Sequence, residues 1–142
     1  MFILDTNVVS ELRKIRAGKA DPNVADWAQR VDASELYISV ITVMELELGI
    51  GALARRDERQ SALLRQWFEG QVLPEFSDRI LPVSTDVALQ CAKLHIPDPR
   101  AERDALIAAT ALVHRMTVVT RNIADFRAIN VVLLNPWEPV AV

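Results

Sequence analysis

Four acidic side chains occupy positions from which carboxylates could act together. Each follows a short β-rich run or lies near the start of an expected helix, and the four are Asp5, Glu45, Asp104 and Asp125. If they converge they repel one another, and some take up protons unless cations intervene. All-oxygen ligands select hard ions such as Mg²⁺ or Mn²⁺ over zinc, which prefers nitrogen and sulfur. A carboxylate-held pair of such ions, about 3.5–4 Å apart, serves phosphoryl chemistry by activating water and stabilising the leaving oxygen.

Each of these acids also has a purely structural interpretation at a helix start. Asp is a favoured N-cap, an acid three residues after Thr or Asn resembles a capping box, and the helix dipole favours first-turn carboxylates. These interpretations are an N-cap for Asp5, capping boxes for Thr42 with Glu45 and Asn122 with Asp125, and a first-turn acid for Asp104. Glu47 serves as a comparison for Glu45, because residues two positions apart lie about 200° apart around a helix and cannot both face one site. We therefore expect Glu45 to face inward and Glu47 to face solvent.

Short apolar runs recur along the chain at intervals that leave room for helices. The expected strands are 2–4, 36–40, 79–83, 117–120 and 131–134, and the expected helices are roughly 6–16, 23–31, 42–56, 59–72, 85–95 and 102–115. Apolar runs without alternation are typical of strands buried on both faces, and their alternation with helices predicts an α/β fold with a largely parallel sheet. Ligands in such sheets bind beyond the carboxyl ends of the strands. We therefore expect Asp5, Glu45 and Asp125 at one edge, and the apolar helix after Asp104 to be buried.

Composition limits the class of protein. The 142 residues suffice for a single domain, 1–142, and 51% hydrophobic with 25% charged residues excludes a disordered chain. Cys91 is the only cysteine, which excludes a disulfide scaffold and suggests a small buried hydrophobe. Without a secretory signal or an apolar run of roughly 20 residues, we expect a cytoplasmic protein that does not enter membranes. The net charge of −3 argues against non-specific coating of nucleic acid.

Other kinds of site find little support. The four glycines form neither a dinucleotide-binding G-x-G-x-x-G nor a phosphate-binding P-loop. His95 and His114 lie inside expected helices without a second ligand at metal-binding spacing. We interpret both histidines as core or surface residues.

Four segments resemble the motifs of PIN domains, the nuclease domains of VapC-type toxins. In order along the chain they are Ile3–Leu12 around Asp5, Ile41–Gly49 around Glu45, Asp104–Ala111, and Val118–Phe126 around Asp125. The resemblance runs in register from residue 2 to about Pro136, which is nearly the whole chain. The Thr-Arg-Asn before the final Asp-Phe is most similar to FitB-like toxins.

This resemblance implies a PIN-like three-layer α/β/α sandwich around a mainly parallel sheet of about five strands. The implied function is a Mg²⁺-dependent endoribonuclease, with Mn²⁺ as an alternative ion, acting on RNA as the toxin of a VapBC-type toxin–antitoxin module. The implied partners are a cognate VapB- or FitA-like antitoxin from an adjacent gene and a second copy of the chain in a homodimer.

The resemblance also assigns expected roles to individual residues. The catalytic, metal-holding acids are Asp5, Glu45, Asp104 and Asp125, of which Asp5 and Asp104 hold the principal ion. The polar neighbours that orient water or phosphate are Thr6, Asn7, Thr120 and Asn122. Many relatives have an acid where this chain has Asn122, so we expect a weaker second-metal side. Relatives often carry a Gly-containing turn where this chain has 96–103, so the approach to Asp104 is expected to differ in shape.

An acidic nuclease needs local cations to hold RNA. Arg103 and Arg121 adjoin the proposed acids and are candidate RNA contacts, and the excess of Arg over Lys suits bidentate phosphate contact. Two further basic clusters are Arg13, Lys14, Arg16 and Lys19, and Arg55, Arg56, Arg59 and Arg65. Solvated helix faces are the alternative interpretation of all these cations. No RNA-stacking aromatic motif is visible, and we expect Trp27, Trp67 and Phe68 in the core or at an interface.

Other functions of an acid-lined α/β protein are less well supported. A phosphohydrolase of the haloacid-dehalogenase type needs a second Asp two residues after Asp5, where this chain has Asn7. A phosphoacceptor receiver domain needs a Lys after a late strand, and the lysines are only Lys14, Lys19 and Lys93. A non-catalytic PIN-fold binding module would have lost its acids, whereas all four remain. The nuclease is the interpretation that these residues favour.

Overall fold

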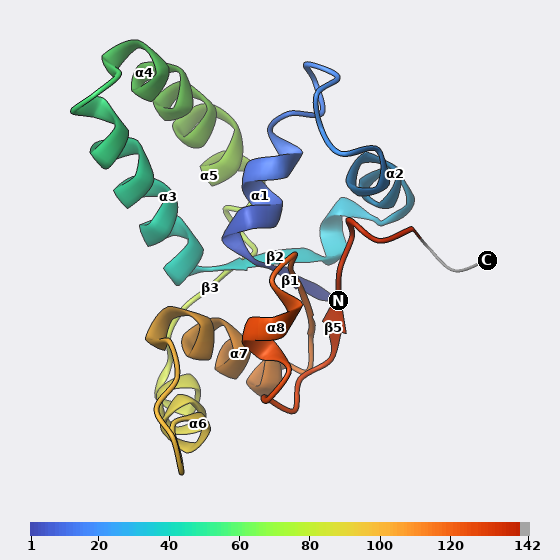
Figure 1. The fold of residues 1–142 in the computed structure, drawn as a ribbon, viewed down its shortest axis with the longest axis vertical. Coiled ribbons are helices and arrows are strands. Elements are labelled where there is room, and N and C mark those ends of the chain that lie inside the picture. The colour runs from blue at the N-terminus through green and yellow to red at the C-terminus, as the bar shows by residue number, and fades with distance from the viewer. Residues whose placement is uncertain (140–142) are drawn as a thin grey trace.

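Five of the apolar runs pair as strands of one sheet. The structure is a computed structural model that describes residues 1–139. The strands are β1 (Phe2–Leu4), β2 (Leu36–Ser39), β3 (Ile80–Leu81), β4 (Thr117–Val119) and β5 (Leu133–Leu134), in the order β3-β2-β1-β4-β5 (Figure 1). Phe2 is in register with Leu36 on one side and Thr117 on the other, so β1 is the central strand. All pairings in this range are parallel, which confirms the predicted sheet.

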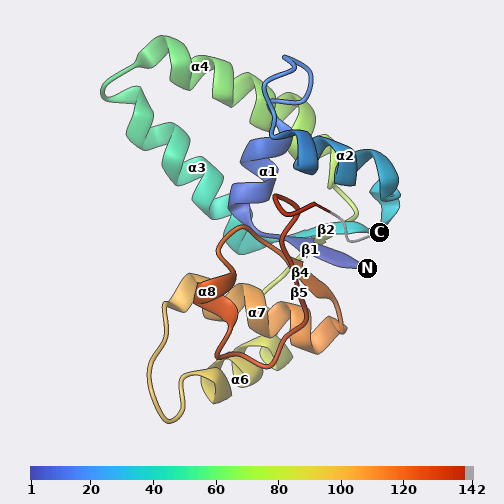
Figure 2. The same ribbon diagram turned by 45° about the vertical axis from the view of Figure 1, so that its right-hand side comes forward.

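Helices cover both faces of the sheet (Figures 1 and 2). The helices on one face are α1 (Thr6–Leu12), α2 (Pro22–Arg30), α3 (Val40–Ala54), α4 (Glu58–Trp67) and α5 (Leu73–Glu75), with a 3₁₀ turn at Ala33–Glu35 and a π-helical turn at Phe68–Val72. The helices on the other face are α6 (Thr85–Leu94), α7 (Glu102–His114) and α8 (Ile123–Phe126). The α/β/α sandwich is thereby confirmed. Among residues 1–139, the helices are all too short or too polar to cross a membrane.

The two faces of the sheet bury separate clusters of apolar side chains, because neighbouring residues on a strand point in opposite directions. Leu4 and Val119 pack with the first group of helices, and Ile3 and Val118 pack with α7 and α8. The apolar helix α7 is buried as predicted, and its small, fully buried side chains are Ala105, Ala108, Ala109 and Ala111. The expected burial of Trp27, Phe68 and Cys91 is also confirmed, and Trp67 packs half-buried against the first cluster.

The first helix is shorter than its sequence pattern predicts. α1 ends at Leu12 rather than near residue 16, and the chain then turns through short-range hydrogen bonds and a left-handed Gly18 with φ of 69°. This turn lets Asp21, the N-cap of α2, donate its backbone N–H to the Glu11 carboxylate at 2.8 Å. Because that contact joins two elements, helical periodicity does not predict it. The short helix α8 is likewise absent from the expected set.

Candidate active site

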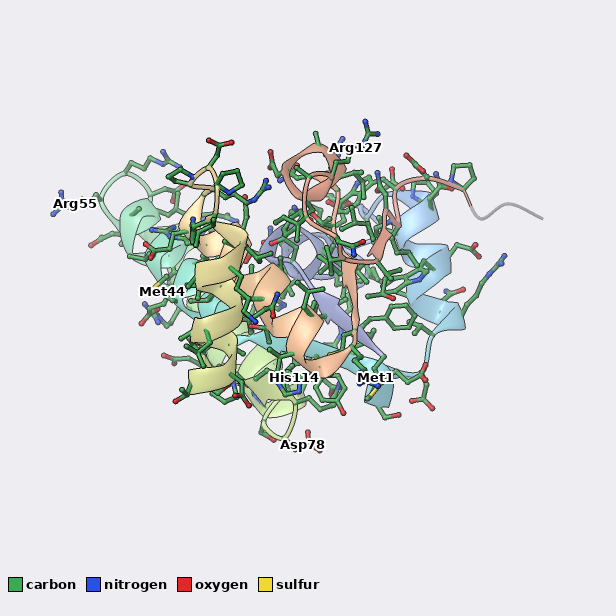
Figure 3. All side chains as sticks on the ribbon, turned by 90° about the horizontal axis from the view of Figure 1, so that it is seen from below. Met1, Met44, Arg55, Asp78, His114 and Arg127 are labelled. Carbon is green, nitrogen blue, oxygen red and sulfur yellow. The ribbon has the colours of Figure 1, made fainter. Side chains whose placement is uncertain are left out.

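The strand and helix directions bring the proposed acids to the carboxyl edge of the sheet. Met1 and His114 lie on one side of the molecule, and Arg127, directly after α8, lies on the opposite side (Figure 3). α7 therefore ends near the edge where β1 begins. The first turn of α7, which contains Asp104, therefore lies toward the opposite edge, where β1 ends and Asp5 follows it.

The four predicted acids lie close enough to affect one another's charge. Burial raises the pKa of Asp104, and the charges of the neighbouring carboxylates Asp5, Asp125 and Glu45 raise it further. The structure thus brings together side chains that follow β1 and β4 and side chains that begin α3 and α7. This convergence is what the parallel sheet predicts for residues beyond its carboxyl edge.

Asp5 is the most deeply buried of the four acids, with 5% of its surface exposed. As the N-cap of α1 it accepts the backbone N–H of Thr6 on Oδ1 at 2.8 Å. Its Oδ2 accepts the Thr120 hydroxyl at 2.8 Å and the Asn7 amide at 3.2 Å. Burial raises the pKa of Asp5 above its ordinary value, although these hydrogen bonds favour the charged form and oppose the rise. Asp5 is therefore both a helix cap and the centre of a polar network.

Glu45 faces the site from α3, as helical periodicity predicts. Its Oε1 lies 2.8 Å from the Thr6 hydroxyl oxygen, and its Oε2 lies 3.6 Å from the guanidinium of Arg103. Glu47 is exposed and pairs with Arg65 on α4. The two glutamates therefore occupy opposite environments although only one residue separates them.

The capping-box interpretations are wrong for both pairs of residues. The N-cap of α3 is Ser39, whose hydroxyl accepts the N–H of Ile41 at 3.0 Å. Thr42 is instead buried inside the helix, with its hydroxyl oxygen 3.1 Å from that of Thr6. Asn122 precedes α8 but makes no side-chain capping bond. In each case the acid three residues later is left available for the site.

Asp104 is the third residue of α7 and is half-buried. It lines a cavity of about 380 Å³ together with Glu45, Ala101, Glu102 and Arg103. Burial first, and then the charges of the other acids, raise the pKa of Asp104 to about 6. A neighbouring cation stabilises the charged form of such a half-buried carboxylate more than it stabilises that of an exposed one, because water screens the attraction less.

Asp125 and Asn122 form the exposed side of the site. Burial is the main cause of the raised pKa of Asp5 and of Asp104, and the charge of Asp125 adds to both shifts. The backbone N–H of Asn122 donates to the Thr120 hydroxyl oxygen at 3.0 Å. That bond ties the loop after β4 to the residue that holds Asp5.

The donor set fits a hard divalent cation, because every candidate ligand is a carboxylate oxygen. As the side chains stand, no three His, Cys, Asp or Glu residues within 1–139 are grouped closely enough to hold an ion. Both oxygens of Glu45 already face partners, Thr6 and Arg103. Within residues 1–139 the four acids are therefore candidate ligands and not an assembled metal site.

The loop that leads into α7 is held by His95 and Arg100. The Nδ1 of His95 accepts the backbone N–H of Arg100 at 3.0 Å, and the Arg100 Nε donates to the carbonyl of Leu94 at 2.8 Å. His95 Nε2 lies 3.7 Å from the sulfur of Cys91. His95 is thus a structural residue, and His114 is exposed at the end of α7.

Two residues near the site were missed by sequence reasoning. Thr42 touches Thr6, which in turn contacts Glu45. Trp137 lies under the guanidinium of Arg121, whose Cζ is 5.3 Å from the centroid of the ring. A sequence signal for Trp137 exists, because it closely follows β5, and the end of β5 shares an edge with the end of β4.

A second groove, larger than the cavity beside Asp104, lies away from the acids. It has a volume of about 610 Å³, and its lining includes Val9 and Leu12 of α1, Trp67 of α4, and Phe76 and Arg79. The acidic cluster and this groove are therefore separate features, and α1 connects them because its N-cap is Asp5 and its residues Val9 and Leu12 line the groove.

Several known proteins are similar to this chain in both fold and sequence. A VapC ribonuclease from Sinorhizobium fredii is 36% identical over 98% of this chain and 99% of its own length. Toxin FitB from Neisseria gonorrhoeae is 36% identical over 97% of this chain and 99% of its own length. The crystal structure of FitAcB from Neisseria gonorrhoeae aligns with a TM-score of 0.86 and 35% identity over 97% of this chain and 99% of that one. Residues 2–131 match the family described as PIN domain, and the chain belongs to that family.

Proposed function

We propose that this protein is a metal-dependent endoribonuclease that hydrolyses RNA phosphodiester bonds as the toxin of a VapBC-type toxin–antitoxin module. The observation that carries the proposal is the set of four carboxylates beyond the carboxyl edge of the sheet. Burial first, and then the charges of the other three, raise the pKa of Asp104 to about 6. The relatives of full length, a VapC ribonuclease and Toxin FitB, support the same activity. The whole chain, 1–142, is proposed to act as one nuclease domain in the cytoplasm.

The residues that would hold Mg²⁺ or Mn²⁺ are Asp5, Asp104, Glu45 and Asp125, with Asp5 and Asp104 at the principal ion. Bound metal would supply activation of water and neutralisation of charge at the phosphate. The hydrogen bonds from Thr6 and Thr120 hold the carboxylates that face it, and the Asn7 amide contacts Asp5 from a third direction. Asn122 is exposed and can present its side-chain amide to water or phosphate.

An RNA-cleavage assay tests this function directly. The purified wild-type protein should cut RNA in Mg²⁺ or Mn²⁺ and lose that activity in chelator. Asp5→Asn and Asp104→Asn should each lose most of the activity. The matched control is Asp86→Asn, since Asp86 is also a first-turn carboxylate, on α6, but is exposed and outside the site. Full activity of Asp104→Asn, in a preparation checked for contaminating nuclease, would contradict the proposal.

The proposed inhibitor is a cognate VapB- or FitA-like antitoxin from an adjacent gene. An extended or helical segment of the antitoxin can bind in the groove beside α1, whose apolar lining includes Leu12, Trp67 and Phe76. A guanidinium carried by that segment could pair two carboxylate oxygens of the acidic site at once. Co-purification with the adjacent gene product should therefore abolish cleavage. Unchanged ribonuclease activity in the purified complex would refute this partner.

The proposed assembly of the chain is a homodimer. Met44 and Leu48 lie one turn apart on α3 and are 41% and 50% exposed, so they form an apolar surface that a second copy can cover. Light scattering should give the mass of a dimer for the wild type and of a monomer for Leu48→Glu. A monomeric wild type at assay concentrations would count against the dimer.

A further inference from the structure

The two arginines beside the acids have different surroundings. Arg103 lies 3.6 Å from Glu45 and so acts as a counter-ion of the site itself. For Arg121, no carboxylate within residues 1–139 lies within 4.0 Å of the guanidinium. Its guanidinium lies instead over the ring of Trp137, with Cζ 5.3 Å from the ring centroid. One cation is therefore already paired, and the other is held in place by an uncharged partner.

The tryptophan under Arg121 is a fixed platform. The backbone carbonyl of Trp137 accepts a hydrogen bond from the side-chain amide of Asn23 on α2 at 2.8 Å. The backbone N–H of Trp137 donates to Oδ1 of Asn135 at 3.0 Å. The indole also packs against the larger apolar cluster of the molecule. A guanidinium that stacks on a fixed ring keeps its N–H groups directed sideways, where they can contact a planar pair of acceptor oxygens.

The backbone of Arg121 is tied to the most deeply buried acid. Its N–H donates to Asn7 Oδ1 at 3.3 Å, and the amide of the same Asn7 donates to Asp5 Oδ2 at 3.2 Å. The preceding residue, Thr120, donates directly to Asp5. The pKa of the nearby Glu11 is lowered chiefly by the hydrogen bond from the backbone of Asp21, with smaller contributions from Lys14 and from the charge of Arg121. The backbone of Arg121 is thus fixed beside Asp5, and its guanidinium has no carboxylate partner within 4.0 Å in the described part of the chain.

An acidic site repels a polyanion, so substrate binding requires a cation that the site does not neutralise. We propose that Arg121, stacked on Trp137, is the residue that positions RNA by contacting a phosphate next to the one being cleaved, whereas Arg103 serves as the counter-ion of Glu45. This assignment rests on the RNA-cleaving function proposed above. It gives different roles to Arg103 and Arg121, although both simply adjoin a proposed acid in the sequence.

Binding of a short labelled single-stranded RNA of mixed sequence to the full chain in chelator, at several salt concentrations, tests the assignment. Each phosphate contact on a single strand contributes about 0.7 to the slope of log affinity against log salt. Arg121→Gln should weaken binding and reduce that slope by about 0.7. Arg115→Gln is the matched control, because Arg115 is an exposed arginine before β4, at the opposite edge of the sheet, and its loss changes the net charge equally. It should leave both quantities as in the wild type.

Two further variants separate charge from geometry. Arg103→Gln should change the salt slope less than Arg121→Gln, since the charge of Arg103 is already balanced by Glu45. Arg121→Lys should retain the salt slope but bind more weakly, because an ammonium keeps the charge and loses the planar guanidinium that lies over Trp137. In Mg²⁺, Arg121→Gln should raise KM for RNA with little change in kcat, as expected for a residue that binds ground state and transition state alike.

The outcomes distinguish this assignment from the proposed function. If the wild type cleaves RNA while Arg121→Gln keeps wild-type affinity and salt slope, the assignment is wrong and the nuclease function stands. The assignment is also wrong if Arg115→Gln loses as much binding as Arg121→Gln, or if Arg103→Gln loses more. If the wild type neither binds nor cleaves RNA, the proposed function fails and the assignment fails with it.

Discussion

The hydroxyl of Thr120 donates a 2.8 Å hydrogen bond to Oδ2 of Asp5, joining two residues that lie 115 positions apart in the sequence. Both residues are buried where the two central strands end side by side. The bond favours the charged form of a carboxylate whose burial disfavours it. This contact is what allows an acid to remain in the interior, at the base of the site.

Replacing Thr120 with Val should destabilise the protein by about 1–3 kcal/mol, because a buried acceptor loses its donor. The pKa of Asp5 should rise further, and metal binding should weaken. Urea unfolding and calorimetric titration with Mg²⁺ measure the two effects. Thr110→Val is the matched control, since Thr110 is equally buried but donates to the carbonyl of Leu106 within α7. Equal metal affinity of Thr120→Val and the wild type would show that the bond serves folding alone.

Removing the charge of Asp104 should stabilise the metal-free protein. The carboxylate is half-buried among like charges, so Asp104→Asn should melt above the wild type in chelator by about 2–5 °C, which corresponds to about 1 kcal/mol. Saturating Mg²⁺ should reverse the order, because an ion that binds only the folded state stabilises it and the variant has lost a ligand. Thermal scans with and without Mg²⁺ measure this, with Asp86→Asn as the control.

The alternative interpretation of Asp104 makes the opposite prediction. If this carboxylate only favours the start of α7, Asn loses the favourable interaction with the helix dipole and the variant melts lower in chelator. A lower melting temperature together with an unchanged response to Mg²⁺ would identify Asp104 as a first-turn acid and not a ligand.

Stability of the metal-free protein should depend on pH through Asp104. Its pKa is raised from 3.8 to about 6, so between these values the folded state holds a proton that the unfolded state has lost. Stability must then fall as pH rises through this window, with the penalty fully present above it. Urea unfolding in chelator across this range measures the slope, and Asp104→Asn should flatten it. A wild-type stability that rises steadily from pH 4 to pH 7 would contradict the raised pKa.

The two glutamates of α3 should differ in their effect on activity. Glu45→Gln should reduce kcat/KM for RNA at least about tenfold, which corresponds to about 1.4 kcal/mol of transition-state stabilisation. Glu47→Gln should stay near the wild type, since Glu47 pairs with Arg65 in solvent and does not face the site. Kinetics with saturating Mg²⁺ measure both variants. Similar losses in both would mean that the charge of α3 matters and not the placement of Glu45.

Local sequence patterns determined much of the framework. Apolar runs of strand length between amphipathic stretches predicted the parallel sheet, and helical periodicity separated Glu45 from Glu47. The near-continuous apolar stretch after Asp104 predicted the buried helix α7. These features depend on the period of one element and on the environment it needs, so neighbouring residues contain the information.

Tertiary packing decided the partners of the polar side chains. Thr42 has the spacing of a capping box, yet it is buried against Thr6 because α3 packs beside α1. Arg103 and Arg121 look equivalent in the sequence, yet one faces Glu45 and the other lies on Trp137. The pKa of Asp104 likewise depends on three acids from distant segments. Such contacts depend on distances between elements, and those distances arise only when the helices pack their apolar faces against the two sides of the sheet.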